Sequence, residues 1–94
     1  KEAILDFNKV IKINHKFAEA YQNRAISKAM LNLNAISDFD QVVILSPDDP
    51  EGYYNRAIYF INFKIKRDYC SDLKKAFSLG YDPSKELLTK YCKT

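Results

Sequence analysis

A six-residue segment of this chain occurs twice, and the duplication limits what the chain can fold into. Residues 21–26 read Tyr-Gln-Asn-Arg-Ala-Ile, and residues 53–58, thirty-two positions later, read Tyr-Tyr-Asn-Arg-Ala-Ile. Self-similarity at a fixed spacing of this size is typical of arrays in which small helical units are stacked. The sequence therefore predicts a stacked-helix repeat before it predicts any chemistry.

Length and composition agree with a small helical protein. The 94 residues are enough for one domain with a modest core, and only two glycines and three prolines interrupt the chain. No window approaches the roughly 18 to 20 apolar residues that a membrane-spanning helix needs. The chain begins at Lys1 without a signal-like apolar run, so we expect a piece of a longer protein.

Hydrophobic spacing predicts six helices joined by short connections. A helix cannot continue through Pro47, whereas Pro50 suits a first helical turn, and Gly80 suits a left-handed helix end. The predicted helices cover residues 2–13, 17–31, 35–45, 50–64, 68–79 and 84–91.

The odd-numbered helices share a second pattern. Residues 4–13 match residues 36–45, and residues 70–79 form a looser copy. In all three copies an aspartate precedes a large apolar residue, and these aspartates are Asp6, Asp38 and Asp72. The chain therefore alternates between two kinds of helix.

This alternation resembles the tetratricopeptide repeat (TPR) family, whose unit is a 34-residue helix–turn–helix. The small residues of the family pattern fall on Ala25 and Ala57 in the first helix and on Ala3 and Ala35 in the second, and the proline between repeats is Pro47. The resemblance covers roughly residues 1–80. It implies an all-α fold in which antiparallel helix pairs stack as a short right-handed solenoid, with residues 82–94 as a C-terminal capping helix.

Within a single TPR domain over residues 1–94, the resemblance divides the chain into repeats. Residues 1–15 would be the second helix of a truncated repeat, and residues 16–49 and 50–81 would be full repeats. The middle repeat is two residues short between Ala25 and Ala35, near Asn32. Either that turn is shortened or two residues are absent from this version of the sequence, and we expect only the turn to differ.

In the family, the first helix of each repeat lines a concave groove that binds a peptide or helix of a partner protein. The resemblance therefore implies a non-catalytic protein–protein interaction scaffold. The family's clamp for a chaperone's C-terminal carboxylate would have Lys and Asn where this chain has Gln22 and Ile26, and Lys and Arg where it has Glu51 and Asn55, so we do not expect that ligand. The concave residues that the resemblance gives are Glu19, Gln22, Asn23, Ile26, Met30, Glu51, Tyr54, Asn55, Ile58, Ile61 and Asn62.

The duplicated Asn-Arg pair suggests two different roles. Asn23 and Asn55 are the first candidates for ligand contacts, because a carboxamide offers both a donor and an acceptor. The competing interpretation is that they bond only to the protein's own backbone or to water. Arg24 and Arg56 are expected to form bidentate bridges to the recurring aspartates, a structural role.

Nothing in the sequence predicts catalysis. The single histidine, His15, lies in a turn and has no cysteine or recurring acid beside it. We find no phosphate-binding loop, no paired catalytic carboxylates and no metal-ligand cluster, so we expect neither an enzyme nor a cofactor or metal. The net charge of +3 is concentrated in residues 62–94, where acids are interspersed. We therefore expect no nucleic-acid partner and no membrane partner.

The two cysteines leave two possibilities open. Cys70 opens the fifth predicted helix and Cys92 follows the sixth, so antiparallel packing would bring the thiols together. A disulfide would then be possible if the Cα atoms lie within about 7 Å. Bridged cysteines would indicate a periplasmic or secreted protein, and reduced cysteines a cytoplasmic one.

An alternative function is structural. Ile4, Phe7 and Ile11 give the first helix an apolar face, and no preceding partner helix is present to cover all of it. Exposed apolar patches usually mark contacts. The alternative is therefore a segment of a longer repeat protein that self-associates through residues 1–13.

Overall fold

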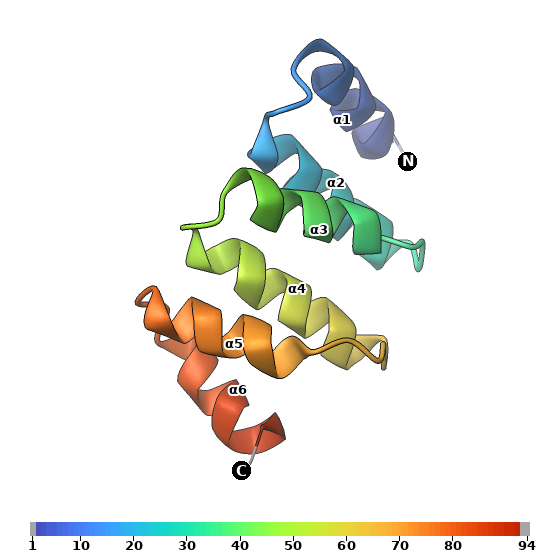
Figure 1. The fold of residues 1–94 in the computed structure, drawn as a ribbon. Helices are drawn as coiled ribbons and strands as arrows, with labels where there is room; N and C mark the ends of the chain where they lie inside the picture. Colours follow the sequence, from blue (N-terminus) through green and yellow to red (C-terminus); the bar gives the residue numbers. More distant parts are fainter. Residues whose placement is uncertain (1, 93–94) are drawn as a thin grey trace. The chain divides into compact units, whose positions relative to one another are not determined.

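The computed structural model describes residues 2–92, and all the regular structure in that range is helical. Figure 1 shows the helices in chain order. They are α1 (Glu2–Ile13), α2 (Ala18–Met30), α3 (Ile36–Leu45), α4 (Pro50–Asn62), α5 (Tyr69–Ser78) and α6 (Pro83–Tyr91). The all-α class and the six predicted helices are confirmed, with ends that differ by at most two residues.

The chain forms two compact units, Lys1–Pro47 and Asp48–Thr94. In the first unit, α2 packs against both α1 and α3; in the second, α5 packs against both α4 and α6 (Figure 1). Small residues permit this close packing, because Ala25 and Ala57 are completely buried. The recurring alanines therefore lie where the helices of each unit are closest to one another.

Polar side chains start several of the helices. Pro50 opens α4, and the Asp49 carboxylate accepts a hydrogen bond of 3.0 Å from the Glu51 amide. At α5 the Asp68 carboxylate accepts one of 3.1 Å from the Ser71 amide. These side chains satisfy amides that have no partner within the helix.

Three helices end with the same backbone pattern. After α2, the Leu33 amide bonds to the Lys28 carbonyl at 2.8 Å, while the amide of Asn32 bonds to the Ala29 carbonyl at 3.0 Å. Equivalent pairs of bonds close α4 and α5, and the residues with positive φ are Asn32 (59°), Lys64 (53°) and Gly80 (98°). This is the Schellman motif, which uses a left-handed residue to satisfy the last carbonyls of a helix. The cap predicted at Gly80 is confirmed.

The core lies on the odd-numbered helices that follow the duplicated segments. Phe39, Val42 and Val43 of α3 are buried, as are Leu73 and Ala76 of α5. Asp38 and Asp72 are buried with them, although charged residues are almost never fully buried unless they are paired. Their partners are described below.

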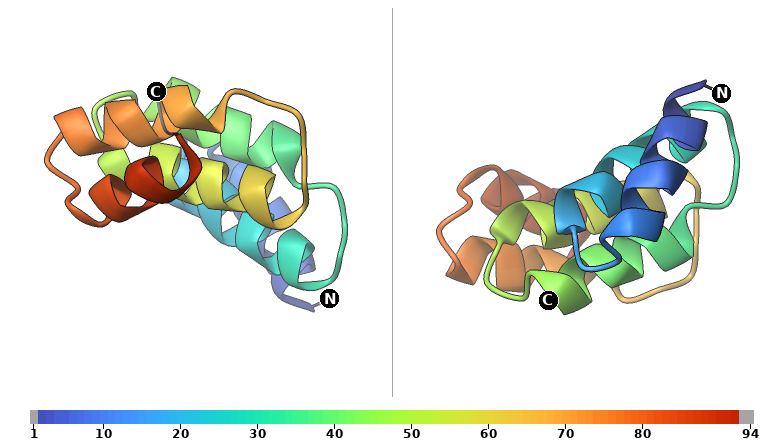
Figure 2. Two further views of the ribbon diagram at one scale, coloured as in Figure 1. Left: turned by 90° about the horizontal axis from the view of Figure 1, so that it is seen from below. Right: turned by 90° about the horizontal axis from the view of Figure 1, so that it is seen from above.

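The apolar face predicted for α1 is only partly used. Ile4, Phe7 and Ile11 are half-buried, but Leu5 and Val10 are exposed, and no residue of α1 is fully buried. The reason is that α1 packs against α2 alone in the first unit, so only one side of it is covered (Figure 2, right). The expectation that part of the apolar face of this helix would be left uncovered therefore agrees with the exposure of Leu5 and Val10.

The two-residue shortfall changes both the turn and the start of α3, so the expectation that only the turn would differ is met in part. Residues 31–35 connect α2 to α3, and residues 63–68 connect α4 to α5, so the turns differ by one residue. The second missing residue is lost from the start of α3. This helix begins two residues before Asp38, whereas α5 begins three residues before Asp72. In the described range, none of the helices has both the length and the apolar character needed to cross a bilayer.

Candidate functional site

The α2 candidates lie along one exposed face. Glu19, Asn23, Ile26 and Met30 are all exposed, with Ile26 at 40% and Met30 at 81%. Their spacing of three or four residues places them above one another on one side of the helix. The face thus combines a carboxylate, a carboxamide and two apolar side chains.

Gln22 differs from the rest of the α2 set. It is half-buried, and its Oε1 atom is buried without a hydrogen-bond partner among the described residues. A buried polar atom without a partner loses its hydration without compensation. The Gln22 carboxamide is therefore a less accessible contact than Asn23.

The corresponding face of α4 is less exposed. Glu51 and Asn62, near its two ends, are exposed, whereas the middle of the face is half-buried. The half-buried members are Tyr54, Asn55, Ile58 and Ile61. The second unit therefore presents these side chains in a more sheltered setting than α2 presents its own.

The two asparagines share an unusual property. Neither the Asn23 nor the Asn55 side chain makes a hydrogen bond to another residue that the structure describes. Among the described residues neither side chain is bonded to the protein's own backbone, and the competing interpretation that they bond to water stays a prediction. Both carboxamides keep a donor and an acceptor available to water or to another molecule.

The neighbouring arginines, in contrast, are engaged within the protein. Arg24 binds Asp38 through two parallel hydrogen bonds, Nε to Oδ2 at 2.8 Å and Nη2 to Oδ1 at 2.6 Å. Arg56 binds Asp72 with the same atoms at the same two distances. The predicted bidentate bridges are confirmed at both positions, whereas Asp6 is exposed and has no ion-pair partner in residues 2–92.

These bridges are sheltered from solvent. The side chains of Asp38 and Asp72 are 2% and 6% exposed, and those of Arg24 and Arg56 are 19% and 16% exposed. The hydrogen bonds that Arg24 donates to Asp38 raise the pKa of Arg24, which outweighs the opposing effect of burial. Such charge-assisted, bidentate bonds fix the geometry of the two helices that they join.

The surroundings of the two bridges were not predicted from the sequence. Asn8 of α1 accepts a bond of 2.8 Å from Nη1 of Arg24, and the Lys28 ammonium lies 3.2 Å from Oδ2 of Asp38. In the second unit Phe60 occupies the position of Lys28, and the guanidiniums of Arg56 and Arg67 lie 5.9 and 5.0 Å from the centre of its ring. The sequence did contain one indication that Lys28 would join the bridge: it follows Arg24 by four residues, and residues four apart share a helix face.

The ring of Tyr54 is partly covered by the connection between α5 and α6. Its ring centre lies 4.7 Å from that of Tyr81, which precedes α6. Burial, and then the neighbouring Tyr81 and Glu86, raise the pKa of Tyr54 above 10.0. The α6 segment therefore shelters part of the face that α4 was predicted to offer.

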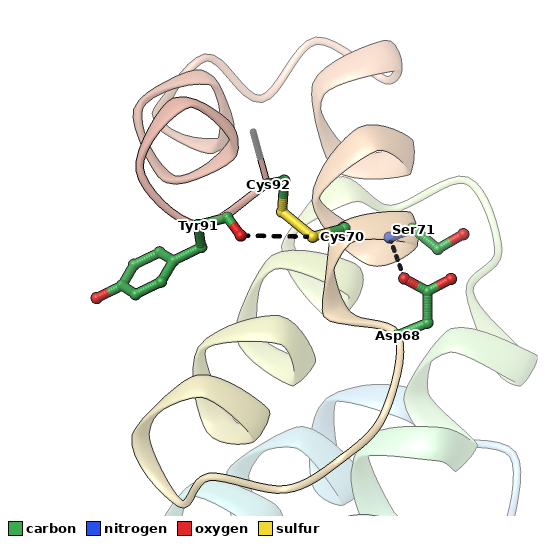
Figure 3. The surroundings of a disulfide bond; sticks show 5 residues. All are labelled: Asp68, Cys70, Ser71, Tyr91 and Cys92. Atoms are coloured by element: carbon green, nitrogen blue, oxygen red, sulfur yellow. Dashed lines mark hydrogen bonds between the residues drawn. A yellow bond between two sulfur atoms is a disulfide. The ribbon is translucent and has the colours of Figure 1, made fainter. Parts of the chain in front are cut away.

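The two cysteines are joined in this structure. Figure 3 shows the disulfide between Cys70, in the first turn of α5, and Cys92, directly after α6. Their Cα atoms are 5.7 Å apart, within the range that disulfides require. The carbonyl oxygen of Tyr91 lies 3.9 Å from the Cys70 sulfur; this is a contact, since a disulfide sulfur carries no proton to donate.

The histidine and the acidic residues are the remaining candidates for chemistry. His15 is exposed in its turn, where its carbonyl accepts a bond of 2.9 Å from the Tyr21 hydroxyl. Across residues 2–92, no three His, Cys, Asp or Glu side chains are grouped to hold a metal ion. The candidate surfaces are thus the faces of α2 and α4, each brought together within its own unit.

A comparison of the chain with protein-family models, with curated proteins and with solved structures found no match.

Proposed function

We propose that this chain is a non-catalytic protein–protein interaction module of the tetratricopeptide repeat type. In this proposal its helix pairs belong to a short right-handed solenoid, and the faces of α2 and α4 are the ligand-binding faces of their own units. The support is the repetition itself, because the same Arg–Asp bridge recurs in both units with equal distances.

The proposed ligand is a peptide or helical segment of a partner protein. One observation carries this proposal: Asn23 and Asn55 occupy matching positions, and neither has a hydrogen-bond partner among the described residues. A peptide backbone offers donors and acceptors in alternation, which a carboxamide can bind whatever the peptide sequence. The exposed Ile26 and Met30 would add apolar contacts beside Asn23.

The test is selection of random peptides displayed on phage against the wild-type chain, followed by binding to an Asn23→Ala/Asn55→Ala variant. We expect the selected peptides to lose at least tenfold in affinity, since each asparagine would lose about one hydrogen bond. The matched control is Lys12→Ala/Lys74→Ala, one exposed residue in each unit. Equal binding to both variants would overturn the proposal.

A second function is favoured by a separate observation on the first unit. An apolar pocket of about 420 Å³ is lined by Ile4, Leu5, Leu31 and Leu33. Leu5 is 59% exposed, and Ile13 at the other end of α1 is 87% exposed. Exposed apolar surface of this kind favours self-association, in which the chain is a structural segment that assembles through α1.

Light scattering at micromolar concentrations separates this second function from the first. A wild-type dimer that a Leu5→Glu/Ile13→Glu variant converts to monomer would support assembly through α1. A wild-type monomer over that concentration range would contradict it. The phage experiment is unaffected by either result, because the substituted residues lie outside α2 and α4.

A further inference from the structure

The last helix, α6, covers part of the second unit. It packs against α5. Tyr81, in the connection from α5 to α6, lies against the ring of Tyr54 on α4 with the centres 4.7 Å apart, and its amide is bonded to the Ala76 carbonyl of α5 at 3.0 Å. Figure 2 (left) shows α6 in front of α4 and beside α5. Whatever holds α6 in place therefore also shelters the part of the α4 face beside Tyr54.

The non-covalent hold on α6 includes an edge-to-face contact between the rings of Tyr69 and Tyr91, whose centres are 6.4 Å apart, but it buries little of the helix. The helix has nine residues, of which only Ser84 is fully buried, while Leu87 and Leu88 are half-buried. Helices of this length are marginal in water without tertiary packing. In addition, the buried Ser84 hydroxyl has no hydrogen-bond partner in the described part of the chain, which opposes docking.

The covalent hold joins the free end of α6 to α5. Cys92 lies directly after α6 and Cys70 in the first turn of α5, so the bond closes a loop with a sequence separation of 22. Chain entropy for a loop of this length favours the closed arrangement by on the order of a hundredfold. Both cysteines are half-exposed, so a reductant has access to the bond.

We propose that the Cys70–Cys92 disulfide is a redox-sensitive strap that holds α6 against α5, and that its reduction releases α6 and uncovers the part of the α4 face that α6 itself shelters beside Tyr54. A dithiol supplies the two electrons and two protons. The bond between the two sulfurs breaks, Cys70 and Cys92 become thiols, and the dithiol closes into its own disulfide. The rest of the second unit stays folded, because α4 and α5 are held by the Arg56–Asp72 bridge and a buried core.

The functional consequence rests on the proposed function of α4. If the α4 face binds a peptide, the docked α6 segment competes with that peptide near Tyr54, and reduction removes the competitor. The strap itself does not depend on any ligand.

Amide hydrogen exchange on the full chain tests the strap, with the oxidised protein compared with the protein in excess dithiothreitol. We expect the amides near the end of α6, including that of Cys92, which bonds to the Leu88 carbonyl at 2.9 Å, to exchange on the order of a hundred times faster after reduction. The amides of α4 and α5 should keep their protection. Equal rates in α6, or loss of protection in all three helices together, would overturn the proposal.

Two variants keep the test specific. Cys70→Ser/Cys92→Ser should exchange like the reduced wild type and should not respond to dithiothreitol. Ser84→Ala removes the buried hydroxyl without a partner, so in reduced protein it should slow α6 exchange severalfold. An α6 that exchanges equally fast with and without Ser84→Ala would contradict the account of weak docking.

Failure of the strap and failure of the proposed function give different results. Exchange reads only the docking of α6, so equal exchange rates would remove the strap and leave the peptide-binding test unchanged. Peptides that bind oxidised and reduced protein equally, alongside release of α6, would show that the strap does not control the ligand.

Discussion

The two Arg–Asp bridges have the same geometry but different neighbours. In the first unit Lys28 lies close to Asp38, and Arg24 also binds Asn8 of α1. In the second unit Phe60 replaces Lys28 and is almost completely buried beneath two guanidiniums. The repeat therefore conserves the bond between neighbouring helices, while the surrounding residues decide whether the bridge is supported by charge or by an aromatic ring.

The largest expected effect follows from removing each arginine in turn. Arg56→Met leaves the buried Asp72 carboxylate without the guanidinium that binds it, and we expect a loss of about 3 to 5 kcal/mol in the free energy of unfolding. Arg24→Met should cost only about 2 kcal/mol, because Lys28 remains 3.2 Å from Asp38. Urea unfolding followed by circular dichroism measures both values. Equal losses would mean that Lys28 does not compensate.

Lys28→Met should have a smaller effect alone, about 0.5 to 1 kcal/mol, since the lysine is partly exposed and Arg24 still neutralises Asp38. Combined with Arg24→Met, it should cost more than the sum of the two single changes, because the carboxylate then loses both cations. Additive losses in the same urea experiment would show that the two cations act independently. Raising the salt concentration should reduce the Lys28 contribution more than that of Arg24.

The turn between α2 and α3 should tolerate lengthening. Inserting Gly-Ser between Leu33 and Asn34 makes this turn one residue longer than its counterpart after α4, and loop entropy predicts a cost of only about 0.3 kcal/mol. The Arg24–Asp38 bridge should persist, so Arg24→Met should cost the same in the lengthened chain. A loss of several kcal/mol on insertion would instead show that the short turn is required for the register of α3.

The smallest expected effect concerns Tyr54, which occupies in the second unit the position that Gln22 has in the first. The raised pKa of Tyr54 means that the folded state keeps its proton more tightly than the unfolded state. This contribution to stability is complete below the unfolded pKa of about 10 and is lost as the pH rises through the folded pKa. Ultraviolet titration of wild type and Tyr54→Phe, by difference, reports the Tyr54 pKa. A value at or below 10 would contradict the sheltering by Tyr81 and α6.

The sequence was sufficient to predict the six helices and both bridges, because these depend on local periodicity and on recurrence. Matched Arg and Asp residues in consecutive repeats imply matched partners, and the structure has them. The contacts of Asn8 and the position of Tyr81 over Tyr54 could not be predicted in the same way. They depend on how neighbouring helices cross and on the path of a connection, neither of which has a periodic signature.

The same distinction applies to α1. Periodicity identifies an apolar face but does not say how much of that face is covered, and Leu5 and Val10 are exposed because α1 has one neighbour in its unit. The candidate binding residues were predicted from a family resemblance rather than from chemistry. The structure adds that Asn23 and Asn55 are unengaged by the described residues, which no sequence pattern could show.

The lack of any fully buried residue in α1 also affects the affinity of any assembly through this helix. Segments with few buried contacts open at the low end of a protein's range of local unfolding free energies. A partner that recognises α1 as a docked helix would find only the fraction of molecules in which it is closed, and its apparent affinity would fall by that fraction. An interface built on α1 would therefore be weaker than its apolar area suggests, and substitutions that raise the helicity of α1 without touching the interface should strengthen it.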